Sequence, residues 1–396
     1  MEPREVLARL AEAGTPPDPA SALRLSVGLD QTIARFRGET LPFIGDGGAD
    51  LQFVFAPYGR GKTHLLKTLQ EVARRQGCVT SYVDCRSGQA PFASLQETYR
   101  AIAGGMTPPG DSSQLLRKSG PESVIEAAMT SVTPERAKEL WAELARDPHV
   151  SSDYRNLASA YCRAVLVDQD GAALGADLRA LLRADLTQRV RVTELYRSYS
   201  WMHRPIGKLG RKNAATWLRS LGSLPVSLGF PGLVILLDET EQTHSIQRLS
   251  SQQRQSHLAN LRNFVDHMAM GNFRGCAIVY AVVEEFLETA KLELEALSQR
   301  IERIRLGNGT PIRNPRAVWV DLDELTQPSP ESAEFYKQLG TRIVQIGREA
   351  GLGEPAVGQL TREIGSHSDV YSRSIKLGAV REFVKMAAGL VAQEVE

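Results

Sequence analysis

The chain has 396 residues, of which 42% are hydrophobic and 23% are charged, as is typical of globular proteins. This composition excludes a mainly disordered or collagenous chain. The formal net charge is +1, from 47 basic and 46 acidic residues, so no global positive field draws the chain to nucleic acid. The apolar runs are shorter than the ~20 residues of a membrane helix, and the start lacks the apolar region of a secretory signal. We therefore expect a cytoplasmic protein with no membrane segment.

The first part of the chain predicts the opening of a parallel α/β sheet. Residues 1–22 read as a short N-terminal helix and a Pro-rich linker, and another helix begins near Gly28 or Asp30. The apolar run Leu51–Phe55 and the run Val79–Val83 are typical of buried strands, and Thr63–Arg75 between them has leucines at helical spacing. The order strand, helix, strand indicates parallel strands.

The rest of the chain adds helices and three more strands. Residues 104–230 have helical periods and predict a large helical insertion. The strand pattern returns as Leu233–Leu237, Cys276–Val283 and Ala317–Asp321, so five parallel strands are expected. We expect an α/β domain over residues 23–325. Residues 326–396 then form a small C-terminal helical domain, with the polar residues 365–369 between two of its helices.

The four cysteines are scattered along the chain, at positions 78, 85, 162 and 276. They form no CxxC pair and have no histidine at a matching spacing. This pattern predicts reduced thiols in the core, and it argues against a disulfide framework or a zinc site.

The strongest motif lies between the first strand and its helix, in the run Ala-Pro-Tyr-Gly-Arg-Gly-Lys-Thr at residues 56–63. It fits the phosphate-binding pattern GxxxxGK[ST] except that alanine replaces the first glycine. In this pattern backbone N–H groups wrap the phosphates, Lys62 reaches the β/γ oxygens and Thr63 holds Mg²⁺. The residues assigned to the nucleotide in this run are Tyr58, Gly59, Arg60, Gly61, Lys62, Thr63 and His64. A histidine in the first turn of a helix is, however, more often a packing residue than a ligand.

A pair of carboxylates completes this arrangement. The apolar strand Leu233–Leu237 ends in Asp238 and Glu239. Alone, such a pair is usually a solvated strand end. Together with Lys62, it predicts that Asp238 holds the Mg²⁺ shell and that Glu239 polarises an attacking water.

The phosphate loop, the acidic pair and the C-terminal helices resemble the AAA+ class of ATPases. More narrowly, the runs at residues 26–28, 55–63, 211–214 and 232–241 resemble the BrxD-type ATP-binding proteins of bacterial BREX phage-defence systems. The resemblance implies an AAA+ (ASCE) P-loop parallel sheet with a helical insertion and a C-terminal helical lid domain. It also implies ATP and Mg²⁺ as cofactors, a homo-oligomer, and partner proteins of the defence system.

The resemblance carries further roles to single residues. Val27 and Gly28 fall where AAA+ proteins touch the adenine, although a hydrophobic residue before a helix is commonplace. Arg300 and Arg303 fall where an arginine finger reaches a neighbour's γ-phosphate, with an ordinary surface helix as the alternative. Arg381, in a GxxR pattern, corresponds to the lid sensor, with a solvated helix face as the alternative. Residues 281–284 offer no asparagine or threonine as a polar sensor, which predicts slow turnover.

A local basic segment lies between residues 187 and 220. It has eight basic residues against the single acid Glu194, interleaved with tyrosines and tryptophans. Such a mixture contacts phosphates and stacks on bases, or it packs on a partner protein. Its candidate contacts to double-stranded DNA are Arg204, Lys208, Arg211 and Lys212.

The sequence therefore predicts an ATPase that acts as a nucleotide-driven motor or switch in anti-phage defence, with DNA as one candidate client. Two alternatives stay open. The first is a DNA-binding loader that resembles the origin-recognition branch of AAA+ proteins. The second is a nucleotide-gated scaffold with little turnover. A P-loop small-molecule kinase would leave the C-terminal helices without a purpose.

Overall fold

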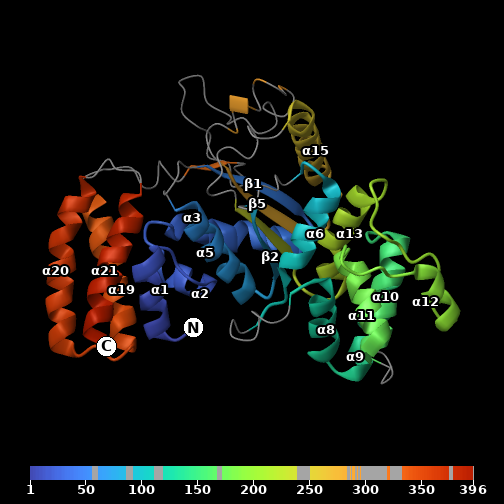
Figure 1. Ribbon diagram of the computed structural model, residues 1–396, viewed down its shortest axis with the longest axis horizontal. Coiled ribbons are helices and arrows are strands. Elements are labelled where there is room, and N and C mark those ends of the chain that lie inside the picture. The colour runs from blue at the N-terminus through green and yellow to red at the C-terminus, as the bar shows by residue number, and fades with distance from the viewer. Residues whose placement is uncertain are drawn as a thin grey trace.

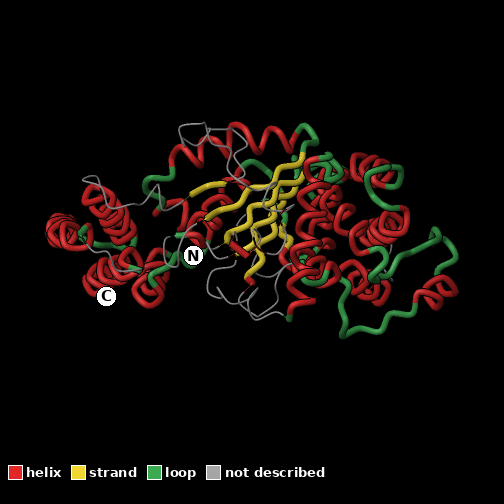
Figure 2. The backbone as a smooth tube through the Cα atoms, turned by 90° about the horizontal axis from the view of Figure 1, so that it is seen from above, coloured by secondary structure: helices red, strands yellow, loops and turns green. Residues whose placement is uncertain are grey.

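The structure is a computed structural model. It describes residues 1–55, 61–85, 92–110, 119–166, 172–238, 250–282, 332–373 and 378–395, together with residues 286, 288, 289, 292, 295 and 319–321. At its centre is a sheet with the strand order β3-β2-β4-β5-β1-β6, which lies between helices (Figure 2). The strands are β1 (Ala49–Phe55), β2 (Val79–Asp84), β3 (Met106–Thr107), β4 (Leu233–Asp238), β5 (Cys276–Val282) and β6 (Trp319–Asp321).

The predicted α/β fold is confirmed, and it is consistent with a P-loop ATPase. Five strands pair in parallel, as the sequence predicts, and the short β3 pairs antiparallel with β2 at the edge. Strand β5 separates β1 from β4, with Phe55 in register with Val282 and Asp238 in register with Ala281. The carboxyl ends of β1 and β4 therefore lie at the same edge of the sheet, about 10 Å apart at two strand spacings. We call this the carboxyl edge.

Side chains of the inner strands alternate between the two faces of the sheet, because a strand has a period of two. Val54 and Val279 pack in one apolar cluster with the helices of the first face. Phe53 and Tyr280 pack in another with the helices of the second face. The first face is covered by α3 (Asp30–Arg35), the π-helical turn η1 (Phe36–Thr40), α4 (Leu41–Gly45) and α5 (Lys62–Arg75). The second is covered by α6 (Leu95–Gly105), α13 (Ala214–Ser227) and α15 (Ser251–Ala269).

The region that the sequence predicts to be a helical insertion, residues 104–230, is mostly helical. Its start forms the edge strand β3 instead, and residues 199–213 contain no helix. Figure 1 places these helices together at one end of the molecule. Trp217 is fully buried among them, and its indole N–H donates to Asp153 at 2.8 Å. The helices are α8 (Pro121–Thr130), α9 (Pro134–Leu144), α10 (Ser152–Leu166), α11 (Ala172–Arg183), α12 (Val192–Ser198) and α13.

The two ends of the chain share one apolar cluster at the other end of the molecule (Figure 1). Helix α1 (Pro3–Ala13) packs against α21 (Ala379–Val395), with Leu7 and Leu10 buried between them. The cluster also includes α19 (Ser332–Glu349), α20 (Glu354–Ser372) and Leu25 at the end of α2 (Pro19–Leu25). The first helix is therefore part of the C-terminal helical unit in space.

Two further segments differ from the sequence prediction. Helix α2 (Pro19–Leu25) begins inside the expected linker, because the Asp18 side chain accepts from the Ser21 backbone N–H at 2.8 Å and a proline occupies the first helical position. Helix α20 continues through the polar residues 365–369, where Ser368 is buried and donates to the Ile364 carbonyl. The Ser368 hydroxyl is satisfied inside the helix, so the polar run does not end it.

All four cysteines are free and buried, as the sequence predicts. Burial raises the pKa of the Cys78 thiol to about 11 and that of Cys276 to about 12. These thiols therefore stay protonated at neutral pH. Among the described helices, none combines the length and the apolar character that a membrane crossing requires.

Candidate functional site

Helix α5 begins at the carboxyl edge with the last residues of the Gly-Lys-Thr motif. Gly61 precedes the helix with a φ of +96°, a left-handed conformation that favours glycine. Among the described residues, no atom lies within 4 Å of the position that a Cβ would take at Gly61. Lys62 is the first helical residue and is only 3% exposed, and Thr63 follows it half-buried. A cation and a hydroxyl thus lie at a helix N-terminus, which itself favours an anion.

Asp238 ends β4 at the same edge and is fully buried. The Tyr82 hydroxyl, from the neighbouring strand β2, donates a hydrogen bond to its Oδ2 atom. A buried carboxylate is stable only when hydrogen bonds or cations replace its water, and Tyr82 supplies one such bond. The Asp238 carboxylate and the Thr63 hydroxyl are hard oxygen donors at one edge, and this donor set fits Mg²⁺.

We predict that the substitution Tyr82→Phe lowers the free energy of unfolding by about 1.5–3 kcal/mol, the usual worth of a hydrogen bond to a charged group. Urea denaturation of the variant and the wild type measures this difference in the free energy of unfolding. The matched control is Tyr161→Phe, which removes a tyrosine bond to the Glu126 carboxylate, whose side chain is 26% exposed. Water replaces that bond in part, so the control should lose less. Equal stabilities of Tyr82→Phe and the wild type would contradict the role of this bond.

A hydrogen-bonded cluster lies on α5 behind the Gly-Lys-Thr residues. His64 Nε2 lies 3.0 Å from the Ser26 hydroxyl, and that hydroxyl lies 2.8 Å from Thr68 Oγ1. Burial lowers the pKa of His64 from 6.5 to about 4, with the positive charges of Lys67 and Arg342 as further causes. The imidazole is therefore neutral at neutral pH and joins the end of α2 to α5 without adding charge.

The residues that the resemblance assigns to the adenine follow this cluster. Val27 is 8% exposed and lies in the same apolar cluster as the C-terminal helices. Gly28 has a φ of +75°, and no described atom lies within 4 Å of a Cβ built on it. Arg381 lies in the first turn of α21, where its Cγ is 2.5 Å from a Cβ built on Gly14. Gly14 therefore permits the close packing of α1 on the start of α21.

Several predicted site residues lie outside the described residues. They are Tyr58, Gly59, Arg60, Glu239, Arg300 and Arg303. The described part of the site comprises Gly61, Lys62, Thr63 and Asp238 at the carboxyl edge, and the segment Ser26–Gly28 lies beside α5.

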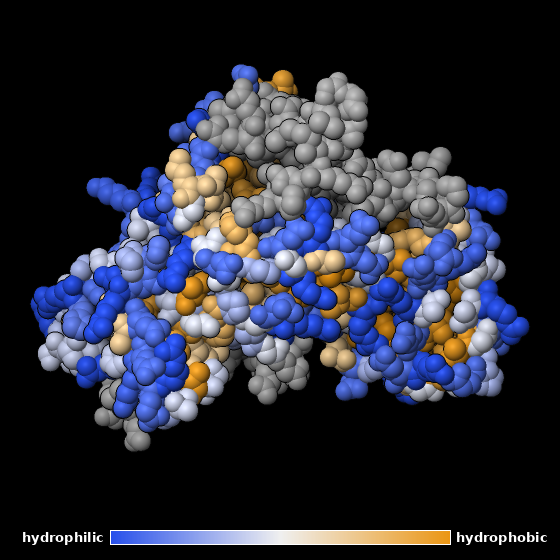
Figure 3. All heavy atoms as spheres, turned by 180° about the vertical axis from the view of Figure 1, so that it is seen from behind, coloured by the Kyte–Doolittle hydropathy of each residue, from blue (hydrophilic) through white to orange (hydrophobic). Residues whose placement is uncertain are grey.

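The basic segment lies within the helical insertion, around α12. Trp217 is buried, so it is not available to stack on a base. The Arg204 guanidinium lies 4.4 Å from the centre of the Tyr196 ring, and that of Arg163 lies 4.2 Å from Trp201. Seen from behind, the molecule carries mainly hydrophilic residues at this end (Figure 3). We call the exposed cations the basic surface, which consists of Arg189, Arg191, Arg197, Arg204, Lys208, Arg211 and Lys212.

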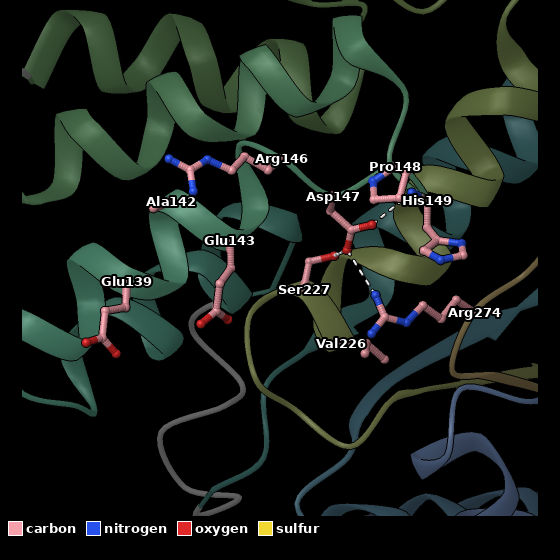
Figure 4. A pocket seen from close by; sticks show the side chains of 10 residues that line it. All are labelled: Glu139, Ala142, Glu143, Arg146, Asp147, Pro148, His149, Val226, Ser227 and Arg274. Carbon is pink, nitrogen blue, oxygen red and sulfur yellow. Dashed lines mark hydrogen bonds and ion pairs between the residues drawn. The ribbon is translucent and has the colours of Figure 1, made fainter.

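A cavity of about 770 Å³ lies between α9, the end of α13 and Arg274, which precedes β5 (Figure 4). The carboxylate of Asp147 lines it and accepts hydrogen bonds from Ser227 at 2.5 Å and from Arg274 at 3.2 Å. This cavity is near the beginning of β5, whereas Asp238 lies at the carboxyl edge. It is therefore separate from the candidate site, and its buried carboxylate joins the insertion to the sheet.

Sequence reasoning missed Tyr82 and Arg342, both of which contact the site or its surroundings. Arg342 Nη1 donates to the carbonyls of Arg24 and Ser26. For Tyr82, the only sequence feature that could have indicated a role in the site is a tyrosine near the end of a strand, and this feature is weak. Arg342 gives no sequence signal, because its partners are backbone atoms more than 300 residues away.

A comparison with known protein families finds a match over most of the chain. The family model for the BREX system ATP-binding protein BrxC/D matches residues 2–188 and 206–358. The match includes Lys62, Thr63 and Asp238, and leaves out residues 189–205 and the helix of Arg381. No curated protein and no solved structure matches the chain. Since the match spans well over half of the sequence, the chain belongs to the family of BREX system ATP-binding proteins BrxC/D.

Proposed function

We propose that the chain binds ATP with Mg²⁺ at the carboxyl edge and hydrolyses it, as a nucleotide-driven switch or motor in phage defence. The observation that carries this proposal is the position of Gly61, Lys62 and Thr63 at the N-terminus of α5, on the same edge as the buried Asp238. Family membership supports the nucleotide and the defence setting.

The chemistry follows from the side chains. The Lys62 ammonium and the N–H groups of the α5 N-terminus bind the β/γ-phosphates. Thr63 and Asp238 would hold Mg²⁺, which neutralises the charge that develops on the phosphates. Glu239 accepts a proton from the attacking water and orients it. Arg381 senses the γ-phosphate, and Arg300 or Arg303 reaches the site of a neighbouring subunit in a homo-oligomer.

Phosphate release by the full chain tests this proposal, measured with ATP and Mg²⁺ in the presence and absence of duplex DNA. Turnover that depends on Mg²⁺ is expected. Sedimentation of the chain with and without ATP tests the homo-oligomer in the same preparation. Nucleotide binding without turnover under every condition would replace the ATPase with the gated scaffold.

A second candidate function is contact with double-stranded DNA, and the basic surface favours it. Arg204, Lys208, Arg211 and Lys212 are exposed and lie close together in sequence. No acidic residue occurs between residues 195 and 237. A local concentration of positive charge binds the phosphate backbone whatever the base sequence.

We predict that replacing both Arg211 and Lys212 with alanine weakens DNA binding. The affinity that remains should depend less on the salt concentration. Each phosphate contact contributes about 0.9 to the slope of log affinity against log salt concentration, so the slope should fall by about 2. Fluorescence anisotropy of a labelled duplex measures both quantities. The control is Arg136→Ala, which removes an exposed arginine that pairs with Glu139 and Glu143. An unchanged slope in the double variant would remove DNA as a partner of this surface.

A further inference from the structure

Arg342 joins the C-terminal helices to the segment that leads into the proposed nucleotide site. From α19, its Nη1 donates to the carbonyl oxygens of Ser26 and of Arg24, the latter at 3.3 Å. These carbonyls lie at the end of α2, where a helix has carbonyl groups without intrahelical partners and a partial negative charge. A planar guanidinium with several donors suits two such acceptors. The contact therefore fixes the direction in which the chain leaves α2.

Ser26, whose carbonyl accepts from Arg342, also contacts α5 through its hydroxyl. The Ser26 hydroxyl lies 3.0 Å from His64 Nε2 and 2.8 Å from Thr68 Oγ1. Ser26 is 3% exposed, and Thr68 is fully buried. Ser26 thus connects α19, through its carbonyl, with the helix that begins at the phosphate-binding residues.

The two residues after Ser26 differ in burial, since Val27 is buried and Gly28 is exposed. Val27 packs in one cluster with Leu339 and Ile343 of α19. Gly28 takes the left-handed conformation, with no described atom near the place of a Cβ. The segment Ser26–Gly28 is therefore anchored on both helices through Ser26 and Val27 and exposed at Gly28. A second contact joins α2 to α19, the Arg24–Glu349 ion pair at 2.6 Å. This ion pair is partly exposed, so it stabilises the packing of the two helices less than the Arg342 contact does.

We propose that Arg342 is a positioning residue for the base of the nucleotide. It holds Ser26–Gly28 in the conformation that accepts the adenine, and it thereby couples nucleotide binding to the docking of the C-terminal helices. This inference rests on the proposed nucleotide site. Coupling is reciprocal, so whatever the docked helices add to nucleotide affinity, the nucleotide adds to their docking. Arg342 acts on the base segment, and the phosphates are left to Lys62 and Arg381.

The experiment compares ATP with inorganic tripolyphosphate, which has the phosphates without the base. Titration calorimetry on the full chain should give an ATP affinity about tenfold lower in Arg342→Gln, as expected for one charge-assisted hydrogen bond. The affinity for tripolyphosphate should change by less than about twofold. Arg342→Lys keeps the charge without the planar fork and should recover part of the loss. A merely structural defect would weaken both ligands alike.

Hydrogen exchange gives a second measurement on the same proteins. ATP should slow exchange in α19 and α21 of the wild type, and this protection should be lost in Arg342→Gln. The matched control is Arg348→Ala, because Arg348 lies on α19 with an exposed side chain and pairs with Glu354 at the surface. If Arg342→Gln fails to fold, Ser26→Ala removes the contact to α5 and should give the same split between the two ligands.

Three outcomes would overturn the inference. Equal losses for ATP and tripolyphosphate would show that Arg342 serves the fold or the phosphates. Unchanged ATP affinity in Arg342→Gln would show that the contact does not position the base. A wild-type chain that binds neither ligand would contradict the nucleotide site itself, which distinguishes failure of the proposed function from failure of the role of Arg342.

Discussion

Lys62→Ala is expected to lower the affinity for ATP by about 100-fold or more and to abolish turnover. Lys62 is 3% exposed and occupies the first position of α5, so its side chain is almost fully buried at the start of the helix. The phosphates would receive two charge-assisted hydrogen bonds from the Lys62 ammonium in a site with little competing water, and two such bonds correspond to about 3 kcal/mol or more. The factor of 100 follows from that free energy.

Thermal unfolding with and without ATP checks the prediction without depending on turnover. A ligand that binds only the folded state raises the melting temperature by mass action. The rise should occur in the wild type and disappear in Lys62→Ala. Arg75→Ala is the control on the same helix, since Arg75 lies in its last turn, 57% exposed. An undiminished rise in Lys62→Ala would place the nucleotide elsewhere.

The sheet and its carboxyl edge could be predicted from local sequence. β4 and β5 are runs of apolar residues that are buried along their whole length, and short continuous apolar runs are typical of inner parallel strands. The motif that ends in Lys62 and Thr63 requires a strand before it and a helix after it, and both are present. Asp238 could be assigned to the same edge because parallel strands end on one side.

The contacts that organise the site could not be predicted, because they depend on which elements become neighbours. The bond from Tyr82 to Asp238 joins residues 156 positions apart and requires β2 to lie beside β4. The contact of Arg342 with Ser26 spans 316 positions and requires α19 to pack near the end of α2. Neither partner of Arg342 is a side chain, so residue type carries no information about it.

The N-terminal helix shows the same limit. Its apolar spacing predicts a helix with one buried face, and nothing in the spacing identifies α21 as its partner. The structure supplies that partner, and Gly14 permits a close approach to Arg381. The division of the chain into domains stays a prediction. In space, however, residues from both ends form one apolar cluster, and Val27 belongs to it.

Glu239→Gln and Asp238→Asn are expected to separate water activation from metal binding. Glu239→Gln keeps the shape of the side chain and removes the base, so ATP binding should persist while turnover falls by about 100-fold to 10,000-fold. Asp238 is fully buried and accepts a hydrogen bond from the Tyr82 hydroxyl. Asp238→Asn should therefore lose most of the increase in ATP affinity that Mg²⁺ gives, because an amide is a weaker ligand for a hard cation than a carboxylate.

The two variants are compared by ATP affinity with Mg²⁺, by ATP affinity with a chelator, and by phosphate release. Glu97→Gln, an exposed acid in the first turn of α6, is the control for an acid-to-amide change away from the edge. If Glu239→Gln turns over like the wild type, Glu239 is not the base. If the wild type binds ATP yet releases no phosphate, even with duplex DNA, the switch works by binding alone, as the lack of an asparagine or threonine sensor at residues 281–284 would suggest.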